Sequence, residues 1–542
     1  MGRFKSTVAR ANTKLSIQLA AVLLASSTLL SSILGLIRDR QLNALYYDTY
    51  PQGIDAYTVA FTVPDFMFFI LVSGALSVSF IPVFSQRLVA GNKRSAWELS
   101  TSVLNLMAVA TLVASVLIII FAEQLVQYVV GPGLSESSRA LAVSMMRVIA
   151  INPFLFAIAT VIASVQQAVG RFTFFALAPA VYNIGIIIGA LFFTSGITIF
   201  GMEIFEGGIM GVALGVVLGS ILQLLVSCVG LFGLGFDYHF KIYWKNRGFR
   251  KVLSLLPARS LDQGIDYVSS IVDTNLASRM AAGTVRAYQQ AAMLSYLPVN
   301  LIGVAISTAA FPKMAERIGQ GRPDLFKKEF QSVLRVIIWL ALPATVIAFF
   351  GRGYLVNFIK NGGDSLMASI FGILALGILF RAIYQLASRS FYARQDTRTP
   401  LYISLFAVGT GVVLAVWFTL GLGMGAHGLA WASVIAALIE MIVLFTVMSK
   451  RIKGLFDASF MNAVGKMASA TGFMAVVTYI SVAMMPLAAA DQSFWATFPK
   501  FVAIVVISLS AYLLLGKLFG LREVRPVIDR IKKILFSRPR VS

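Results

Sequence analysis

Several ionisable side chains lie inside or at the ends of long apolar stretches of this sequence. A charge at the centre of a membrane span costs about 2.5–3.5 kcal/mol on insertion scales, so a chain carries few such residues without a use for them. These residues are Arg38, Asp39, Asp55, Asp65, Arg147, Asp262, Asp266, Asp273, Arg335, Arg381 and Glu440. Arginine presents a planar fork of donors that matches pairs of phosphate oxygens. Basic groups in the first, fourth and tenth apolar stretches therefore indicate a wet cavity suited to a diphosphate head group.

The carboxylates among these residues suggest a second task. They would pair with the cavity arginines when no ligand is bound, or take up a coupling cation such as sodium or a proton. Asp65 and Asp273 are the candidates for this role. An alternative is that the charged residues at span ends are interfacial groups near water, and that the side chain of Arg147 snorkels to the surface. Both interpretations remain open from the sequence.

The composition excludes a soluble enzyme. The chain has 542 residues, of which 58% are hydrophobic and 13% charged, whereas soluble domains are about 45–50% apolar and about 25% charged. The sequence has no phosphate-binding loop, no cluster of metal ligands and no Gly-x-Ser-x-Gly elbow, and its one cysteine, Cys228, excludes a disulfide framework. We therefore expect a polytopic membrane protein that is not an enzyme and has no cofactor and no metal site.

About fourteen stretches are apolar and long enough to cross a bilayer as helices, which takes about 20 residues each. They are 15–37, 56–84, 100–122, 140–168, 173–194, 208–235, 260–280, 287–311, 329–350, 366–389, 401–421, 427–449, 463–486 and 496–517. The segments between them alternate between rich and poor in Lys and Arg. By the positive-inside rule this places both termini in the cytoplasm and explains most of the net charge of +22 without nucleic acid.

The expected fold is an all-α polytopic bundle with two six-helix lobes and two further C-terminal helices. The predicted parts are an N-lobe at 1–235 (spans 1–6), a cytoplasmic inter-lobe loop at 236–259, a C-lobe at 260–450 (spans 7–12), an extra helix pair at 451–521 (spans 13–14) and a basic cytoplasmic tail at 522–542. A weak internal repeat supports the two lobes, since Pro82 precedes Arg87 by five residues just as Pro312 precedes Arg317.

Six motifs add a more specific indication. They are SILGLIRD at 32–39, GALSVSFIPVFS at 74–85, APAVYNIGIIIGAL at 178–191, GVAISTAAFP at 303–312, SFYARQDTRTP at 390–400 and HGLAWAS at 427–433. Together, over the chain to about residue 450, they resemble the MviN/MurJ family, the lipid II flippases of bacterial cell-wall synthesis within the MOP exporter superfamily. The resemblance implies fourteen helices, a V-shaped pair of lobes that opens alternately to each face, and a groove for a long lipid tail in the last two spans.

The resemblance also implies roles for individual residues. Arg38, Asp39 and Asp55 match cavity positions of the family, and Arg259 resembles a recurring family arginine. The family often has arginine at three positions that here are Ser32, Phe68 and Met293. We predict that Arg286 and Arg147 replace these missing cations. The predicted substrate-binding residues are thus Arg38, Asp39, Asp55, Arg147, Arg259 and Arg286.

The leading functional hypothesis is alternating-access translocation of the undecaprenyl-diphosphate-linked peptidoglycan precursor from the inner to the outer leaflet. It predicts a multi-pass protein of the bacterial inner membrane, a lipid-linked diphosphate substrate, contact with membrane lipids and with peptidoglycan synthesis proteins, and coupling to membrane potential, sodium or protons. Two alternatives are a MATE-like drug or cation antiporter and a non-transporting membrane scaffold for cell-wall synthesis. Basic groups outnumber acidic ones in the predicted cavity, which favours the flippase over the antiporter.

Overall fold

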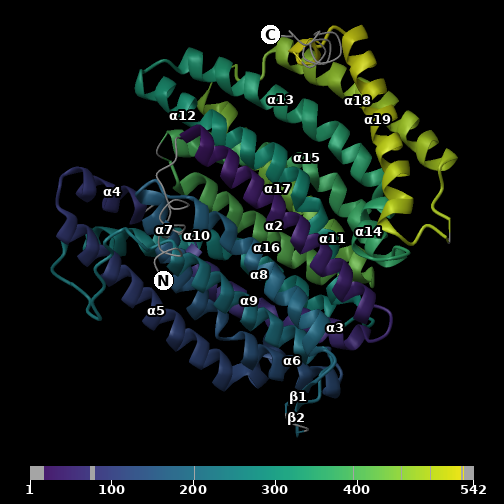
Figure 1. Cartoon of the computed structure of the whole chain (residues 1–542). Coiled ribbons are helices and arrows are strands. Elements are labelled where there is room, and N and C mark those ends of the chain that lie inside the picture. The colour runs from purple at the N-terminus through teal and green to yellow at the C-terminus, as the bar shows by residue number, and fades with distance from the viewer. Residues whose placement is uncertain are drawn as a thin grey trace, which may run out of the picture. The chain divides into compact units, whose positions relative to one another are not determined.

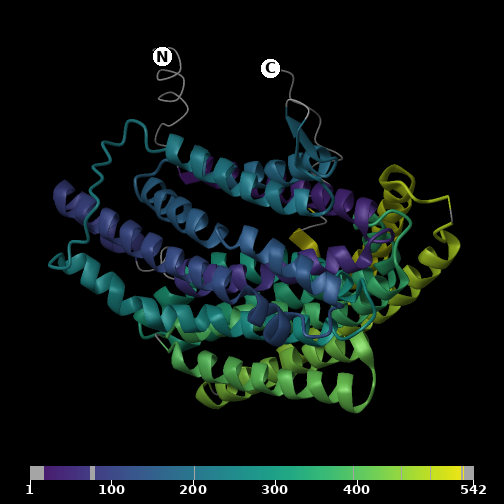
Figure 2. The same cartoon turned by 90° about the horizontal axis from the view of Figure 1, so that it is seen from below.

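The computed structural model describes residues 17–73, 80–199, 202–394, 396–452, 454–488, 490–526 and 529. The chain is predominantly helical and divides into two compact units, Met1–Arg286 and Ala287–Ser542. Figure 1 labels the helices, and Figure 2 gives a second view of them. In the described residues, thirteen helices are long and apolar enough to cross a membrane. This confirms the all-α polytopic fold expected from the sequence.

The first unit is built from long apolar helices joined by short turns. Its helices are α2 (Ile17–Tyr46), α3 (Pro51–Phe68), α4 (Ile81–Val89), α5 (Lys93–Gln124), α6 (Glu136–Ile149), α7 (Asn152–Ala168), α8 (Thr173–Ile188), α9 (Met210–Val229) and α10 (Arg247–Ala277). A short antiparallel hairpin of β1 (Ile197–Ile199) and β2 (Met202–Phe205) interrupts the connection from α8 to α9. The hairpin is a local addition to an otherwise helical unit.

The second unit repeats this architecture. Its helices are α11 (Thr284–Pro298), α12 (Ala305–Gly319), α13 (Pro323–Phe350), α14 (Arg352–Ile359), α15 (Ser365–Ala393), α16 (Arg398–Val416), α17 (Gly425–Arg451), α18 (Ala458–Met484) and α19 (Phe494–Leu518). Helix α11 begins three residues before the boundary between the units. The last two helices, α18 and α19, match the predicted pair of C-terminal spans.

Helix α10 begins earlier than the sequence indicated. The segment 236–259 was expected as a loop, but the helix starts at Arg247 because Asn246 caps it. The Asn246 side-chain oxygen accepts the backbone N–H groups of Gly248 at 3.0 Å and Phe249 at 3.2 Å, which satisfies donors that a helix start leaves open. Helix α10 contains the predicted seventh span and is grouped with the first unit. The lobe limits drawn from the sequence stay a prediction.

Helices α8 and α9 approach closely enough to fix the position of a polar side chain. A Cβ atom on Gly185 would lie 2.3 Å from the Cα of Gly219, and one on Gly189 would lie 2.4 Å from the Cα of Gly215. Small residues at such spacing let membrane helices pack backbone to backbone. Helix α8, which also packs against α2, is therefore held firmly, and it carries Asn183 toward α2.

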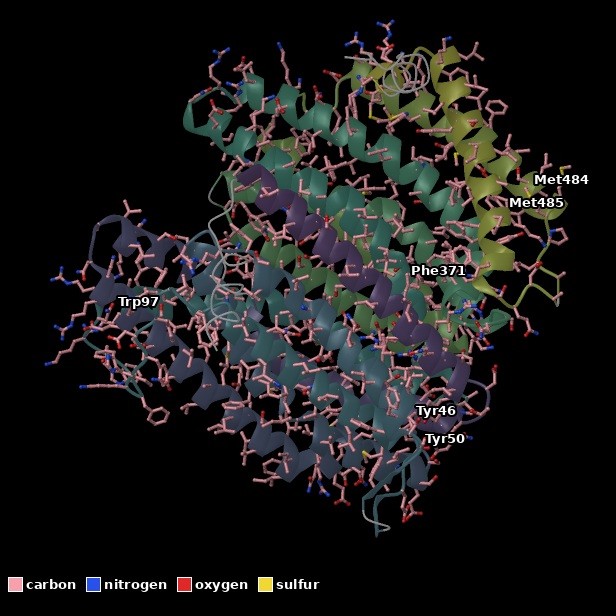
Figure 3. All side chains as sticks on the ribbon, in the orientation of Figure 1. Tyr46, Tyr50, Trp97, Phe371, Met484 and Met485 are labelled. Atoms are coloured by element: carbon pink, nitrogen blue, oxygen red, sulfur yellow. The ribbon has the colours of Figure 1, made fainter. Side chains whose placement is uncertain are left out.

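Each unit has its own apolar core. In the first unit, Trp97 of α5, labelled in Figure 3, contacts the ring of Phe236 edge-on with centroids 5.5 Å apart. In the second unit, α13, α15, α17 and α18 contribute buried side chains such as Phe330 and Leu386. Phe371 of α15, also labelled, is buried as well. These cores make the helices rigid supports for the polar groups described next.

Candidate functional site

The C-terminal half of α2 carries an arginine that is held by two partners. The guanidinium of Arg38 donates to both carboxylate oxygens of Asp39, at 3.1 Å from Nη2, and to the side-chain oxygen of Asn183 at 2.9 Å from Nη1. Asn183 in turn donates to the Ser31 hydroxyl and to the Pro179 carbonyl. Because both partners of Arg38 come from helices that pack together, its guanidinium has a defined orientation.

A second arginine completes the pairing of Asp39. Arg286, on the first turn of α11, donates from Nη2 to Asp39 at 3.1 Å and from Nε to the side-chain oxygen of Asn43 at 3.0 Å. Asp39 is 2% exposed and Arg286 is 4% exposed. One buried carboxylate thus bridges two guanidinium groups, an arrangement that is stable only when every charge keeps its partner.

Asp55 has a different task, since it caps a helix from a distance. Its Oδ2 accepts the backbone N–H of Gly283 at 2.6 Å, and its Oδ1 accepts the backbone N–H of Arg286 at 2.9 Å. These amides are at the start of α11, where backbone donors have no partner within the helix and the helix dipole favours a negative charge. Asp55 is buried and bonds to the backbone of Arg286, and its predicted role in substrate binding stays a prediction.

We call these residues the Arg38 cluster: Arg38, Asp39, Asn43, Asp55, Asn183 and Arg286. The members of the cluster differ in their exposure. The side chain of Arg38 is 23% exposed, whereas the other ionised members are almost completely buried. Two guanidinium groups face two carboxylates, so the formal charges of the cluster balance. Arg38 is the one cation of this set that can reach an incoming anion.

Asp65, Tyr57 and Tyr182 lie within electrostatic range of Arg38. Asp65 is half-buried in the last turn of α3. The predicted coupling role of Asp65 stays a prediction, but its position places a further carboxylate beside the exposed guanidinium.

Other predicted residues lie apart from the Arg38 cluster. Arg147 is exposed on α6 and donates to the backbone carbonyl of Ile119 on α5 at 3.3 Å. Asp273 is half-buried on α10, and its predicted coupling role stays a prediction. The side chains of Arg259, Asp262 and Asp266 lie outside the described residues. The substrate-binding roles of Arg147 and Arg259 stay predictions.

The sequence reasoning missed the two asparagines. Asn43 and Asn183 supply the neutral oxygens that hold Arg286 and Arg38. Their signal was present as lone amides within apolar stretches, where a polar group needs a partner. The positions where arginine was expected carry no charge, and Phe68 packs edge-on against Phe156 with centroids 5.5 Å apart.

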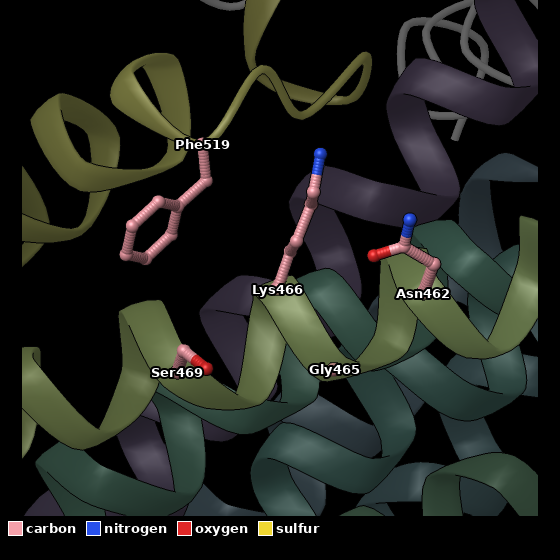
Figure 4. A pocket seen from close by; sticks show the side chains of 5 residues that line it. All are labelled: Asn462, Gly465, Lys466, Ser469 and Phe519. Atoms are coloured by element: carbon pink, nitrogen blue, oxygen red, sulfur yellow. The ribbon is translucent and has the colours of Figure 1, made fainter.

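A surface pocket lies beside α18 of the second unit. It has a volume of about 270 Å³ and is lined by Asn462, Gly465, Lys466, Ser469 and Phe519. Figure 4 shows the Lys466 side chain extending between Phe519 and Asn462. The pocket is in the helix pair for which a lipid-tail groove was predicted, and that assignment stays a prediction. Among the residues that the structure describes, no group of three or more His, Cys, Asp or Glu could hold a metal ion.

The helical architecture and the buried ion pairs are those of a polytopic membrane protein, and the fold is similar to that of a member of the MOP superfamily. A solved structure titled as a multidrug resistance MATE family transporter of that superfamily, in an inward-facing conformation, matches the fold with a TM-score of 0.66 at 16% identity, covering 81% of this chain and 99% of that one. A second solved structure, titled as the lipid II flippase MurJ in an inward closed conformation, matches with a TM-score of 0.73 at 24% identity and covers 94% of this chain and all of that one.

The sequence comparison is more specific. The family model described as lipid II flippase MurJ matches residues 52–498, so the chain belongs to the MurJ family of lipid II flippases. A relative from Thermotoga maritima named as a probable lipid II flippase MurJ is 25% identical over 512 residues, which cover 93% of this chain and 97% of the relative. The chain is thus a multi-pass inner-membrane protein of this family, and the resemblance drawn from the motifs is confirmed.

Proposed function

We propose that this protein carries lipid II, the undecaprenyl-diphosphate-linked disaccharide pentapeptide, from the inner to the outer leaflet by alternating access of its two lobes. Family membership supports this function. The observation that carries it is Arg38, a partly exposed guanidinium in a membrane span that two neighbours hold in a fixed orientation. Transport of this kind requires no covalent step, and we propose that the chain has no catalytic activity and needs no cofactor.

Arg38 is the residue that contacts the diphosphate. Its bonds to Asp39 fix the plane of the guanidinium, while Nη1 is held by the neutral amide of Asn183. A phosphate oxygen forms a stronger, charge-assisted hydrogen bond than an amide oxygen does. An arriving diphosphate therefore displaces Asn183 more readily than Asp39. Asp39, Asp55 and Arg286 act through Arg38 as positioning residues.

Energy for the cycle comes from the membrane. An inside-negative potential favours outward movement of a negative head group by about 2.3 kcal/mol per charge per 100 mV. Asp65 and Asp273 are the proposed sites of a coupling sodium ion or proton. A carboxylate beside Arg38 would keep the guanidinium paired after the substrate leaves.

Topology and partners complete the proposal. Both termini lie in the cytoplasm, in accord with the basic segments that end at the tail 522–542. The substrate is lipid-linked, and membrane lipids surround the apolar helices. Peptidoglycan synthesis proteins are the proposed protein partners.

The test is rescue of a bacterium depleted of its own lipid II flippase. We expect Arg38→Ala to abolish rescue while the protein inserts normally, as measured by immunoblot of the membrane fraction. Arg94→Ala is the matched control, because Arg94 is a largely exposed arginine of the same unit whose one carboxylate partner is Glu98. Full rescue by Arg38→Ala would contradict the role of Arg38.

The same assay separates the alternatives. A scaffold predicts that Arg38→Ala rescues growth and that deletion of residues 522–542 does not. An antiporter predicts that the wild-type chain exports cationic dyes and fails to rescue.

A further inference from the structure

A second arginine lies in the middle of a membrane helix of the other unit. Arg381 is the seventeenth of the 29 residues of α15. Its Nη1 donates to the hydroxyl of Tyr296 on α11, and its Nη2 donates to the hydroxyl of Ser433 on α17 at 2.6 Å. Three helices of the second unit therefore meet at this guanidinium.

The position of Arg381 prevents its charge from reaching the membrane surface. At 1.5 Å per residue, the nearer end of α15 is about 18 Å away, which is more than an arginine side chain spans when it snorkels. The residue must therefore face protein or water within the bundle, because a charge facing lipid at this depth is strongly unfavourable.

The charge of Arg381 is not neutralised by a contact. In the part of the chain that the structure describes, no carboxylate lies within 4.0 Å of the guanidinium, and Nε is buried without a hydrogen-bond partner. Glu440 lies within electrostatic range, and its carboxylate accepts a hydrogen bond from the Ser404 hydroxyl at 2.7 Å. Arg335 of α13 provides the contrast, since it meets Glu523 directly at 2.6 Å.

The surroundings of Arg381 hold the guanidinium in place without cancelling its charge. The ring of Tyr296 lies against it, with the guanidinium carbon 4.7 Å from the ring centroid. Two hydroxyl acceptors and an aromatic face fix its plane, and both Arg381 and Tyr296 remain partly exposed. A cation that is oriented, partly accessible and not ion-paired is the arrangement that an oxyanion binds with little reorganisation.

We propose that Arg381, held by Tyr296 and Ser433, binds an oxyanion of the transported precursor. This inference rests on the proposed function and adds a contact in the second unit to that of Arg38. The oxyanion has two chemical sources in the substrate, the diphosphate and the carboxylates of the pentapeptide. Both suit the fork of an arginine.

The test is native mass spectrometry of the full-length protein with three ligands offered separately. These ligands are lipid II, the same lipid without its peptide, and undecaprenyl diphosphate. We expect Arg381→Gln to weaken binding of lipid II roughly tenfold or more, as for loss of a charge-assisted hydrogen bond. Equal weakening for all three ligands assigns Arg381 to the diphosphate, and weakening for lipid II alone assigns it to the peptide.

Two further variants, Arg389→Gln and Arg381→Lys, serve as controls for Arg381→Gln. Arg389→Gln makes the same change two turns further along α15, where the arginine bonds to Gln385, and should leave binding unchanged. Arg381→Lys keeps the charge but loses the fork, and should bind with intermediate affinity even if Arg381→Gln fails to fold. Unchanged binding in both Arg381 variants, or an equal loss in Arg389→Gln, would overturn the inference. Binding of none of the three ligands by the wild type would overturn the proposed function as well.

Discussion

The Arg38 cluster of the first unit and Arg381 of the second unit are stabilised by opposite means. In the first unit, Asp39 bridges Arg38 and Arg286, and the formal charges of the Arg38 cluster balance when Asp55 is counted as well. In the second unit, Arg381 is held by two hydroxyls and an aromatic ring, and its charge has no contacting counter-ion in the described residues. An arginine inside a membrane helix is therefore not by itself a sign of ligand contact. Its counter-ions and its exposure together show whether the charge serves the architecture or remains available.

The largest effect should follow from removing the shared carboxylate. Asp39→Ala removes the carboxylate that the Nη2 group of buried Arg286 contacts, while the neutral oxygen of Asn43 stays at Nε. Breaking a buried ion pair on one side typically costs about 3–5 kcal/mol. We expect a loss of that size in the free energy of unfolding, measured by chemical denaturation in detergent.

A double variant tests the cause of this loss. Asp39→Ala combined with Arg286→Met removes both buried charges, and part of the lost stability should return. If the free energy of unfolding of Asp39→Ala differed from that of the wild type by less than about 1 kcal/mol, Asp39 would not be an essential buried counter-ion.

The next largest effect should follow from replacing Asp55, which caps the start of helix α11. The carboxylate of Asp55 accepts hydrogen bonds from the backbone N–H groups of Gly283 and Arg286. Asparagine has only one side-chain oxygen, and its NH₂ group cannot accept a bond. In Asp55→Asn, one of the two N–H groups therefore loses its partner. An unsatisfied buried donor costs about 1–3 kcal/mol. Hydrogen exchange at the start of α11 should become faster.

Asp364 offers a matched control for Asp55. Asp364 caps α15 through one oxygen, which accepts the N–H of Met367 at 2.6 Å. Asn is about as good an N-cap as Asp when one oxygen suffices. Asp364→Asn should therefore leave exchange at α15 nearly unchanged, and an equal effect of both variants would contradict the two-oxygen role of Asp55.

A smaller effect is expected at Arg381. Replacing it by Gln removes a mid-span charge that no contacting carboxylate needs, so the free energy of unfolding should change by no more than about 1 kcal/mol. Chemical denaturation beside Asp39→Ala provides the comparison. A loss as large as that of Asp39→Ala would mean that Glu440 depends on Arg381 as its counter-ion, and the contrast between the units would fail.

The sequence was sufficient for the fold class. Apolar length and charge alternation depend on local composition, so the approximate positions of most spans were predictable, although helix α10 starts 13 residues before the span predicted at 260–280. The partnership of Asp55 with the start of α11 was not, because 228 residues separate Asp55 from Gly283. Arg147 was grouped with Arg38 on charge alone, and only the packing of α6 against α5 shows that it bonds to the Ile119 carbonyl instead. Residue type predicts what a group can bind, whereas tertiary packing decides which partner it meets.

The smallest effect is expected at an ion pair between a loop and the end of a membrane-crossing helix. Asp396, between α15 and α16, accepts bonds from the hydroxyl of Thr399 at 2.6 Å and from Arg451. Partial burial raises the pKa of Asp396, but these bonds outweigh it and lower the pKa from 3.8 to about 2. A carboxyl group whose pKa is lower in the folded state stabilises the protein above pH 3.8, and this stabilisation is lost as the pH falls through about 2. Because the pair is partly exposed, it should contribute less than about 1 kcal/mol to the free energy of unfolding.

Asp396→Asn should therefore lower the thermal unfolding midpoint slightly at pH 6, and the gap to the wild type should close as the pH is lowered to 2. The hydroxyl of Thr399 can still bond to the side chain of the asparagine. The pH-dependent part of the stability difference therefore comes from the charge of Asp396 that faces Arg451. A gap that stays constant with pH would mean that hydrogen bonding, not charge, accounts for the effect. A gap as large as that of Asp39→Ala would contradict the argument that burial, more than pairing, sets the energetic weight of an ion pair in this protein.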